Sequence, residues 1–230
     1  MPAKKTKQPP VSAPVVAGFA PSVTVGGQAM PTWPEGLDVV RLSDEPTILM
    51  TWFQDTAAYH EALVARMLEL ESDPGFAHRM PIGGTKLRDV HRWGIPEADL
   101  VHQRATAFVA QAVGREEVTM DLGWGNVSRR GEYLSPHSHD VSLLSVVYCV
   151  SAGDRDLNDG GDPDSVDGRL AMVDPRIPYC CNRQPNCVTR ELWPDMRPGA
   201  MVLFPSELVH FVHPYHGEAP RITIAWNFSL

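Results

Sequence analysis

The chain has 230 residues, of which 43% are hydrophobic and 21% are charged, and this length suffices for one domain with a substantial core. The formal net charge is -8 and the one basic cluster is a short lysine-rich segment near the start, so we expect no nucleic-acid partner. No apolar run approaches the roughly 20 residues that span a bilayer, and proline and glycine interrupt the start of the chain where a signal peptide would be apolar. We therefore expect a cytoplasmic protein without a membrane partner.

The four cysteines are too few and too clustered for the disulfide framework of a small secreted domain. Cys180, Cys181 and Cys187 lie in one short segment. Their adjacent pair and missing fourth ligand fit a structural zinc site poorly. We expect reduced loop thiols or a local disulfide there.

Residues 1–30 are rich in Pro, Ala, Val, Gly and Lys without periodicity, which is typical of a disordered leader. Residues 31–230 are expected to form a single domain, with a helical part at about 38–115 and a β-rich core at about 118–230.

Two amphipathic helices are expected in the helical part. Between Asp55 and Asp73, apolar residues recur at helical spacing, and Asp55 is the expected N-cap. Residues 95–116 repeat this pattern, and Pro96 suits the first turn of a helix.

From Val118 onward, short β-branched and aromatic runs alternate with clusters of Gly, Pro and Asp, which indicates short strands. The runs cover residues 118–127, 141–150, 168–174, 200–214 and 221–230. Helices followed by short strands predict a mainly β fold of the α+β class, an antiparallel sandwich or barrel with helices packed on one face.

Three histidines are candidate metal ligands. His137 and His139 are two residues apart, so an extended strand places both imidazoles on the same face, where they can reach one ion. A third ligand must come from elsewhere, and His210 follows a strongly apolar strand. His213 and His216 come at looser spacing and are expected to be non-ligands.

The last predicted strand carries a candidate site for a carboxylate. Arg221 and Thr223 alternate with isoleucines and therefore share a face. A buried arginine is costly unless it is paired, and a planar guanidinium beside a hydroxyl suits a carboxylate held through both oxygens.

Three sequence blocks together resemble the Fe(II)/2-oxoglutarate-dependent oxygenases, and most closely a bacterial and phage subfamily of them. The blocks are GEYLSPHSHDVSLLSVVYCV, then GRLAMVDPR, then PGAMVLFPSELVHFVHPYHGEAPRITIAWNFSL. The resemblance runs from about Trp124 to Asn227, and its specificity lies in the order and combination of the blocks.

This resemblance implies a double-stranded β-helix, the cupin-like jelly roll, preceded by N-terminal helices. It implies that His137 and His210 are the proximal and distal ligands of Fe(II). It also implies that Arg221, with Thr223, binds the far carboxylate of the co-substrate 2-oxoglutarate, and that Tyr148 adds a hydroxyl to this clamp.

The third ligand is where the sequence departs from the wider superfamily, which reads H-x-D or H-x-E at this place. His139 can coordinate as a third neutral imidazole, Asp140 can reach the metal if the strand bulges, or His139 can replace His137 as the proximal ligand with no carboxylate. Period-2 geometry favours the first arrangement. Asp140 would then accept a hydrogen bond from a ligand imidazole.

The activity that the resemblance implies is a dioxygenase that uses O2, with oxidative decarboxylation of 2-oxoglutarate coupled to hydroxylation of a C–H bond in a small molecule, amino acid or peptide. One alternative is a three-His cupin-like dioxygenase that does not use 2-oxoglutarate. Another is a non-catalytic jelly roll that binds a metal or a carboxylate. A homodimer is possible on this sequence, although no pattern supports it.

Overall fold

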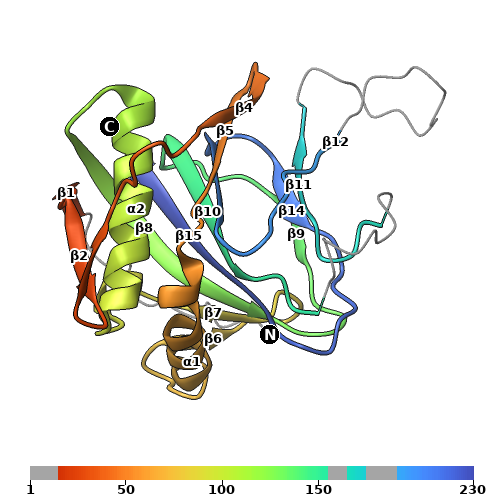
Figure 1. The fold of residues 1–230 in the computed structure, drawn as a ribbon. Helices are drawn as coiled ribbons and strands as arrows, with labels where there is room; N and C mark the ends of the chain where they lie inside the picture. Colours follow the sequence, from red (N-terminus) through yellow and green to blue (C-terminus); the bar gives the residue numbers. More distant parts are fainter. Residues whose placement is uncertain (1–14, 155–164, 175–190) are drawn as a thin grey trace, which may run out of the picture.

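Two β-sheets face each other, and two helices cover the outer face of the larger sheet, so that the molecule has three layers (Figure 1). The structure is a computed structural model and describes residues 15–154, 165–174 and 191–230. Cys180, Cys181 and Cys187 lie outside the described residues. The expected jelly roll with flanking helices is confirmed.

The larger sheet contains nine antiparallel strands in the order β4-β5-β13-β10-β15-β8-β7-β6, and β1 also pairs with β8. Their bounds are β1 (Val15–Gly18), β4 (Val40–Asp44), β5 (Thr47–Trp52), β6 (Ala77–Arg79), β7 (Thr85–Leu87), β8 (Glu117–Ser128), β10 (Leu144–Ser151), β13 (Ala200–Pro205) and β15 (Arg221–Ser229).

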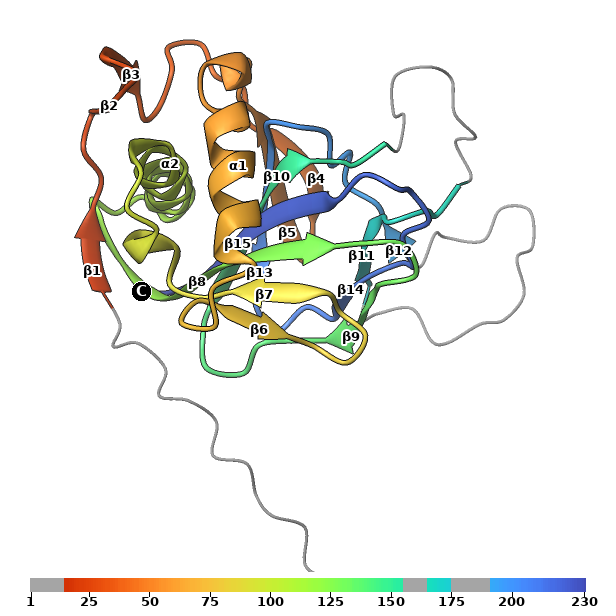
Figure 2. The same ribbon diagram turned by 90° about the horizontal axis from the view of Figure 1, so that it is seen from below.

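The smaller sheet contains four strands in the order β12-β11-β14-β9. They are β9 (Leu134–His137), β11 (Leu170–Val173), β12 (Glu191–Leu192) and β14 (His210–Val212). The chain passes between the sheets where the expected strand 200–214 divides into β13 and β14, at a turn that follows Pro205. Strands β9 and β14 belong to the smaller sheet and β15 to the larger one (Figure 2). His137 and His210 therefore come from one sheet and Arg221 from the other.

The two helices occur where the sequence predicts them, as α1 (His60–Leu70) and α2 (Pro96–Val113). Pro96 occupies the first turn of α2, and Gly114 ends the helix in the left-handed conformation that glycine adopts without strain. The N-cap prediction for α1 was wrong. A short 3-10 helix, η1 (Thr56–Ala58), comes first, so Tyr59 caps α1 and the Asp55 carboxylate pairs with Arg104 on α2. A second 3-10 helix, η2 (Val90–Arg92), precedes α2.

The strands of the larger sheet are buried on both faces, because one face packs on the helices and the other on the smaller sheet. The helix-side core includes Val146, Tyr148, Ile222 and Trp226. A second core between the sheets includes Cys149, Leu170, Met172, Phe204 and Val212. Neighbouring residues of β10, such as Tyr148 and Cys149, therefore point into different cores, as the alternation of a strand requires.

The sequence predicts a disordered leader up to residue 30, but the structure places strands within its second half. Besides β1, the hairpin of β2 (Ser22–Val25) and β3 (Gln28–Pro31) lies beside α2. Val25 and Met30 of this hairpin are buried in the helix-side core. Period-2 alternation over four residues is too short a signal to identify such strands from sequence. The division into a leader and one domain otherwise stays a prediction.

The described helices also bear on membrane insertion. None of those in residues 15–154, 165–174 and 191–230 combines the length and the apolar character that crossing a bilayer requires.

Candidate active site

A cavity of about 420 Å³ lies between the two sheets and is the place where the predicted site residues meet. Its lining includes His137, His139, His210, Arg221 and Thr223. The remaining wall is largely apolar, and within the described chain no aspartate or glutamate contributes to it. A mostly apolar cavity with a few convergent polar groups is typical of a small-molecule site.

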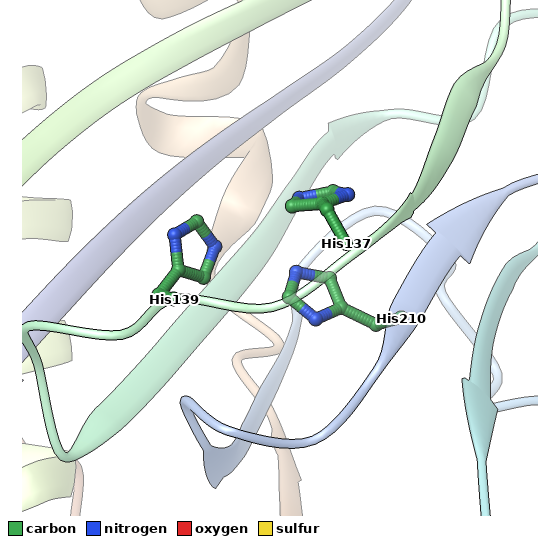
Figure 3. Close-up of side chains that lie close together, drawn as sticks. All are labelled: His137, His139 and His210. Atoms are coloured by element: carbon green, nitrogen blue, oxygen red, sulfur yellow. The ribbon is translucent and has the colours of Figure 1, made fainter.

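The three histidines lie close enough to hold one metal ion. Each offers a ring nitrogen, and these ligand atoms all lie within 4.8 Å of one another (Figure 3). His137 and His210 are direct cross-strand partners on β9 and β14, so the pairing of the two strands brings their rings to a centroid distance of 4.3 Å.

Hydrogen bonds to the backbone fix which nitrogen of two of the imidazoles faces the shared space. Nδ1 of His137 lies 2.7 Å from the carbonyl oxygen of Ser135, and Nδ1 of His210 lies 2.8 Å from that of Leu208. A carbonyl oxygen only accepts, so each Nδ1 carries the proton and donates it. Nε2 of each neutral ring then keeps its lone pair for a metal, which is the arrangement that metal-binding histidines usually show.

His139 reaches the cluster in a different way from the one that strand periodicity predicts. Strand β9 ends at His137, and His139 lies in the segment that follows it. Its backbone N–H donates to the carbonyl oxygen of Ser206, 2.8 Å away, and this bond ties the segment to the end of β13. The His139 ring lies 5.2 Å from that of His210. Asp140 is exposed and is not part of the three-histidine group.

The environment of His139 and His210 favours their neutral form. Burial is the main cause that lowers the pKa of His210 to about 3, and the neighbouring histidines lower it further. Burial, followed by His137 and Lys86, lowers the pKa of His139 to about 4. Neutral rings are the form that binds a metal, so the lowered pKa values of these two residues and the geometry of all three histidines fit a three-imidazole metal site.

Arg221 and Thr223 face the cavity from β15, as their alternation predicts. Arg221 is buried, which lowers the pKa of its guanidinium. No carboxylate in the part of the chain that the structure describes forms an ion pair with it, and the charge of Asp167 raises its pKa by less than burial lowers it. A buried cation without an ion pair is costly, and an anionic ligand would compensate it.

The predicted role of Tyr148 is not compatible with the structure. Its hydroxyl bonds to the Tyr59 hydroxyl at 2.7 Å and to His60 Nε2 at 2.6 Å, on the helix side of the sheet. In the register of β10 and β15, Cys149 pairs with Thr223 and Tyr148 with Ile224. Residues that pair share a face, so Tyr148 and Thr223 point to opposite faces and Val147 lines the cavity instead.

Removal of the Tyr148 hydroxyl distinguishes a role in binding 2-oxoglutarate from a role in the stability of the fold. We expect Tyr148→Phe to leave the affinity for 2-oxoglutarate unchanged and to lower the free energy of unfolding by about 1–3 kcal/mol, because buried hydrogen-bond partners lose their contact. Isothermal titration with 2-oxoglutarate and urea unfolding measure the two quantities. A loss of affinity with unchanged stability would restore Tyr148 to the ligand clamp.

Several cavity residues were not predicted from the sequence. Trp124 forms part of the cavity wall, and Lys86 of β7 lies above its ring at 3.9 Å from the ring centroid. Burial lowers the pKa of Lys86 to about 8. The loop between β6 and β7 contributes Met80, Pro81 and Ile82. No local pattern in the sequence marks these residues as cavity residues. The pairing of β7 with β8 in the folded chain brings them to the site.

His213 and His216 do not join the group of His137, His139 and His210, as expected. His213 Nε2 lies 3.2 Å from a carboxylate oxygen of Glu191, and His216 Nδ1 lies 3.3 Å from one of Asp167. Acidic partners at these positions account for both side chains.

Comparison with protein families gives a match over the β-rich half of the chain. Residues 123–227 match the family described as "Putative 2OG-Fe(II) oxygenase". Over these residues the chain is similar to the 2OG-Fe(II) oxygenases. Members of that family bind Fe(II) and 2-oxoglutarate, and the matched residues contain all three histidines with Arg221 and Thr223. No curated protein sequence matches the chain.

Solved structures support the fold of this chain. A prolyl hydroxylase from Trichoplax adhaerens, in complex with a peptide fragment of hypoxia inducible factor, is 16% identical, with a TM-score of 0.58 and coverage of 81% of this chain and 85% of that one. AviO1 from Streptomyces viridochromogenes is 17% identical, with a TM-score of 0.55 and coverage of 79% and 89%.

HygX from Streptomyces hygroscopicus, with nickel and 2-oxoglutarate bound, is 15% identical, with a TM-score of 0.55 and coverage of 79% of this chain and 82% of that one. At such identities the likeness concerns the fold. It places this chain among proteins built on the same jelly roll.

Proposed function

We propose that this protein is an oxygenase that hydroxylates a C–H bond of a small molecule, amino acid or peptide, with His137, His139 and His210 holding Fe(II). The observation that carries the proposal is the placement, in a single cavity, of three imidazoles and one buried arginine that forms no ion pair within the described residues. The proteins of similar fold support the substrate class, since one is in complex with a peptide and HygX is solved with hygromycin B.

The residues of the chain have distinct tasks in this reaction. Bound Fe(II) would supply the oxidative decarboxylation of 2-oxoglutarate by O2 to succinate and carbon dioxide, coupled to oxidation of the second substrate. Arg221 and Thr223 orient 2-oxoglutarate by binding its far carboxylate through charge-assisted hydrogen bonds. The hydrogen bonds from Nδ1 of His137 and His210 keep their rings in the ligating orientation. The apolar wall excludes water from the site.

Anaerobic titration tests the proposal directly. Protein loaded with Fe(II) is titrated with 2-oxoglutarate, and the visible charge-transfer band of a chelated keto acid is the expected result. Succinate formation under air then measures turnover. A correctly metallated protein that develops no band would refute the assignment and favour the three-His dioxygenase that does not use 2-oxoglutarate. Absence of metal binding would leave only a non-catalytic jelly roll.

Replacement of Arg221 measures the clamp separately from the metal. We expect Arg221→Met to raise the dissociation constant of 2-oxoglutarate roughly 100-fold, because hydrogen bonds to a charged group contribute about 1.5–3 kcal/mol. Affinity for Fe(II) alone should stay unchanged. Arg130→Met is the matched control, since Arg130 is exposed and pairs with Glu218. Undiminished 2-oxoglutarate binding in Arg221→Met would remove Arg221 from the clamp.

The remaining properties predicted from sequence stay predictions. These are the cytoplasmic location, the absence of nucleic-acid and membrane partners, and the homodimer.

A further inference from the structure

Lys86 lines the cavity at the end of a row of three polar residues, which also contains Asn126 and Thr223. Strand β7 pairs with β8 and β8 with β15, and their registers align Lys86 with Asn126 and Asn126 with Thr223. All three residues line the cavity. Residues aligned across neighbouring strands share a face, so the row leads from the expected 2-oxoglutarate clamp to the ammonium group of Lys86.

Lys86 also lies beside the metal cluster. Its Nζ is 3.9 Å from the centroid of the Trp124 ring, and the Trp124 ring is 5.8 Å from that of His139. The cation is thus held over an aromatic face, at the side of the cavity where His139 contributes to the cluster.

Lys86 has no acidic partner among the described residues. Across the described ranges, no carboxylate forms an ion pair with Lys86, and the cavity wall contains no acidic residue. Lys86 is the only lysine in the sequence after Lys7, and the other basic residues after Lys7, apart from the histidines, are arginines. A partly buried cation without a counter-charge is destabilising, which suggests that a ligand supplies the counter-charge.

Charge balance indicates that 2-oxoglutarate alone does not supply it. Fe(II), Arg221 and Lys86 bring four positive charges to the loaded cavity, and the neutral imidazoles bring none. The two carboxylates of 2-oxoglutarate bind the metal and Arg221 and leave an excess of two positive charges. A carboxylate ligand in the place of His139 would remove one of them, so this cavity is more cationic than that of an oxygenase with the usual H-x-D.

We propose that Lys86 anchors a carboxylate of the substrate that is oxidised, so that the oxygenase acts on a carboxylate-bearing small molecule or peptide. This inference rests on the proposed function. One ammonium group matches one carboxylate, whereas a phosphate dianion would need more donors than this side of the cavity offers. The apolar residues Met80, Pro81 and Ile82 of the adjoining loop bind the remainder of the substrate.

Matched pairs of acids and amides test the proposal. Protein loaded with Ni(II) and 2-oxoglutarate is titrated calorimetrically with hexanoate and octanoate, and with hexanamide and octanamide as their neutral counterparts. At least one acid should bind about tenfold or more tightly than its amide, as expected for a charge-assisted hydrogen bond. Lys86→Met should abolish this preference, and Lys86→Arg should keep most of it. Circular dichroism verifies that both variants fold.

Chemical labelling gives a second readout that does not depend on turnover. Hexanoate should protect Lys86 from acetylation in the intact protein, as measured by peptide mass spectrometry, while hexanamide should not. Lys4, Lys5 and Lys7 in the same sample are internal controls. Equal affinity for acids and amides, or no binding of either acid, would overturn the proposal.

The outcome for 2-oxoglutarate separates this inference from the proposed function. If Lys86→Met weakens 2-oxoglutarate binding and leaves acid binding intact, Lys86 belongs to the co-substrate site and the inference is wrong. If the wild-type protein binds no 2-oxoglutarate, the proposed function fails. The acid and amide titrations of the Ni(II) protein then still decide the role of Lys86.

Discussion

His210→Ala is expected to lower the affinity for Fe(II) by more than about 100-fold and to abolish succinate formation. Changes to residues that merely orient metal ligands already cost 10–100-fold, and His210 supplies a ligand atom directly in the proposed site. Isothermal titration with Ni(II) or anaerobic Fe(II) measures affinity. His213→Ala is the control, because His213 lies on the same segment as His210 but pairs with Glu191. This variant should bind metal like the wild type. Unchanged metal affinity in His210→Ala would refute the proposed cluster.

The third ligand is decided by three further variants of the same experiment. His139→Ala should lose metal affinity, whereas Asp140→Ala should keep it, because Asp140 lies outside the group of converging ligand atoms. His139→Asp introduces the carboxylate that the superfamily uses at this place and should retain metal. The opposite result, with loss in Asp140→Ala and retention in His139→Ala, would assign the ligand to Asp140.

The group of three histidines was predictable because local and regional signals agree on it. The H-x-H spacing and the apolar strand before His210 are both visible in the sequence, and the cross-strand pairing of His137 with His210 completes the geometry. The way in which His139 is held was not predictable. The position of His139 depends on a hydrogen bond to Ser206, which lies 67 residues further along the chain, and not on strand alternation.

The wrong prediction for Tyr148 and the failure to identify Lys86 have a common physical origin in strand pairing. Tyr148 is one residue away from Val147, the β10 residue that faces the cavity, and a shift of one residue along a strand moves a side chain to the other face of the sheet. Lys86 lies on a strand of only three residues, too short for a periodic signal. Gly84, next to this strand, has φ +80 and a backbone so close to the Val127 carbonyl oxygen that an added Cβ would lie 2.4 Å from it. Such contacts depend on the folded chain.

The pairing of Asp55 with Arg104 also joins residues far apart in the sequence, and it stabilises the contact of η1 with α2. Arg104 Nη1 donates to Asp55 Oδ1 at 2.8 Å and to the Tyr59 hydroxyl at 2.9 Å. The Arg104 side chain is 0% exposed, whereas that of Asp55 is 32% exposed. Burial alone would lower the pKa of Arg104, but the hydrogen bonds with Asp55 raise it above its usual value.

This asymmetry predicts that removal of the acid costs more stability than removal of the base. Asp55→Ala leaves a fully buried guanidinium without its counter-charge and should lower the free energy of unfolding by about 3–5 kcal/mol. Arg104→Met leaves a carboxylate that can still reach water and should cost less. The double variant should lose less stability than the sum of the two single losses, because it leaves no charge without its partner. Urea unfolding measures all three, with Arg41→Met as the control, since the exposed pair of Arg41 with Asp44 should contribute at most about 1 kcal/mol. Equal costs for the two single variants would show that the buried charge is hydrated in the folded protein.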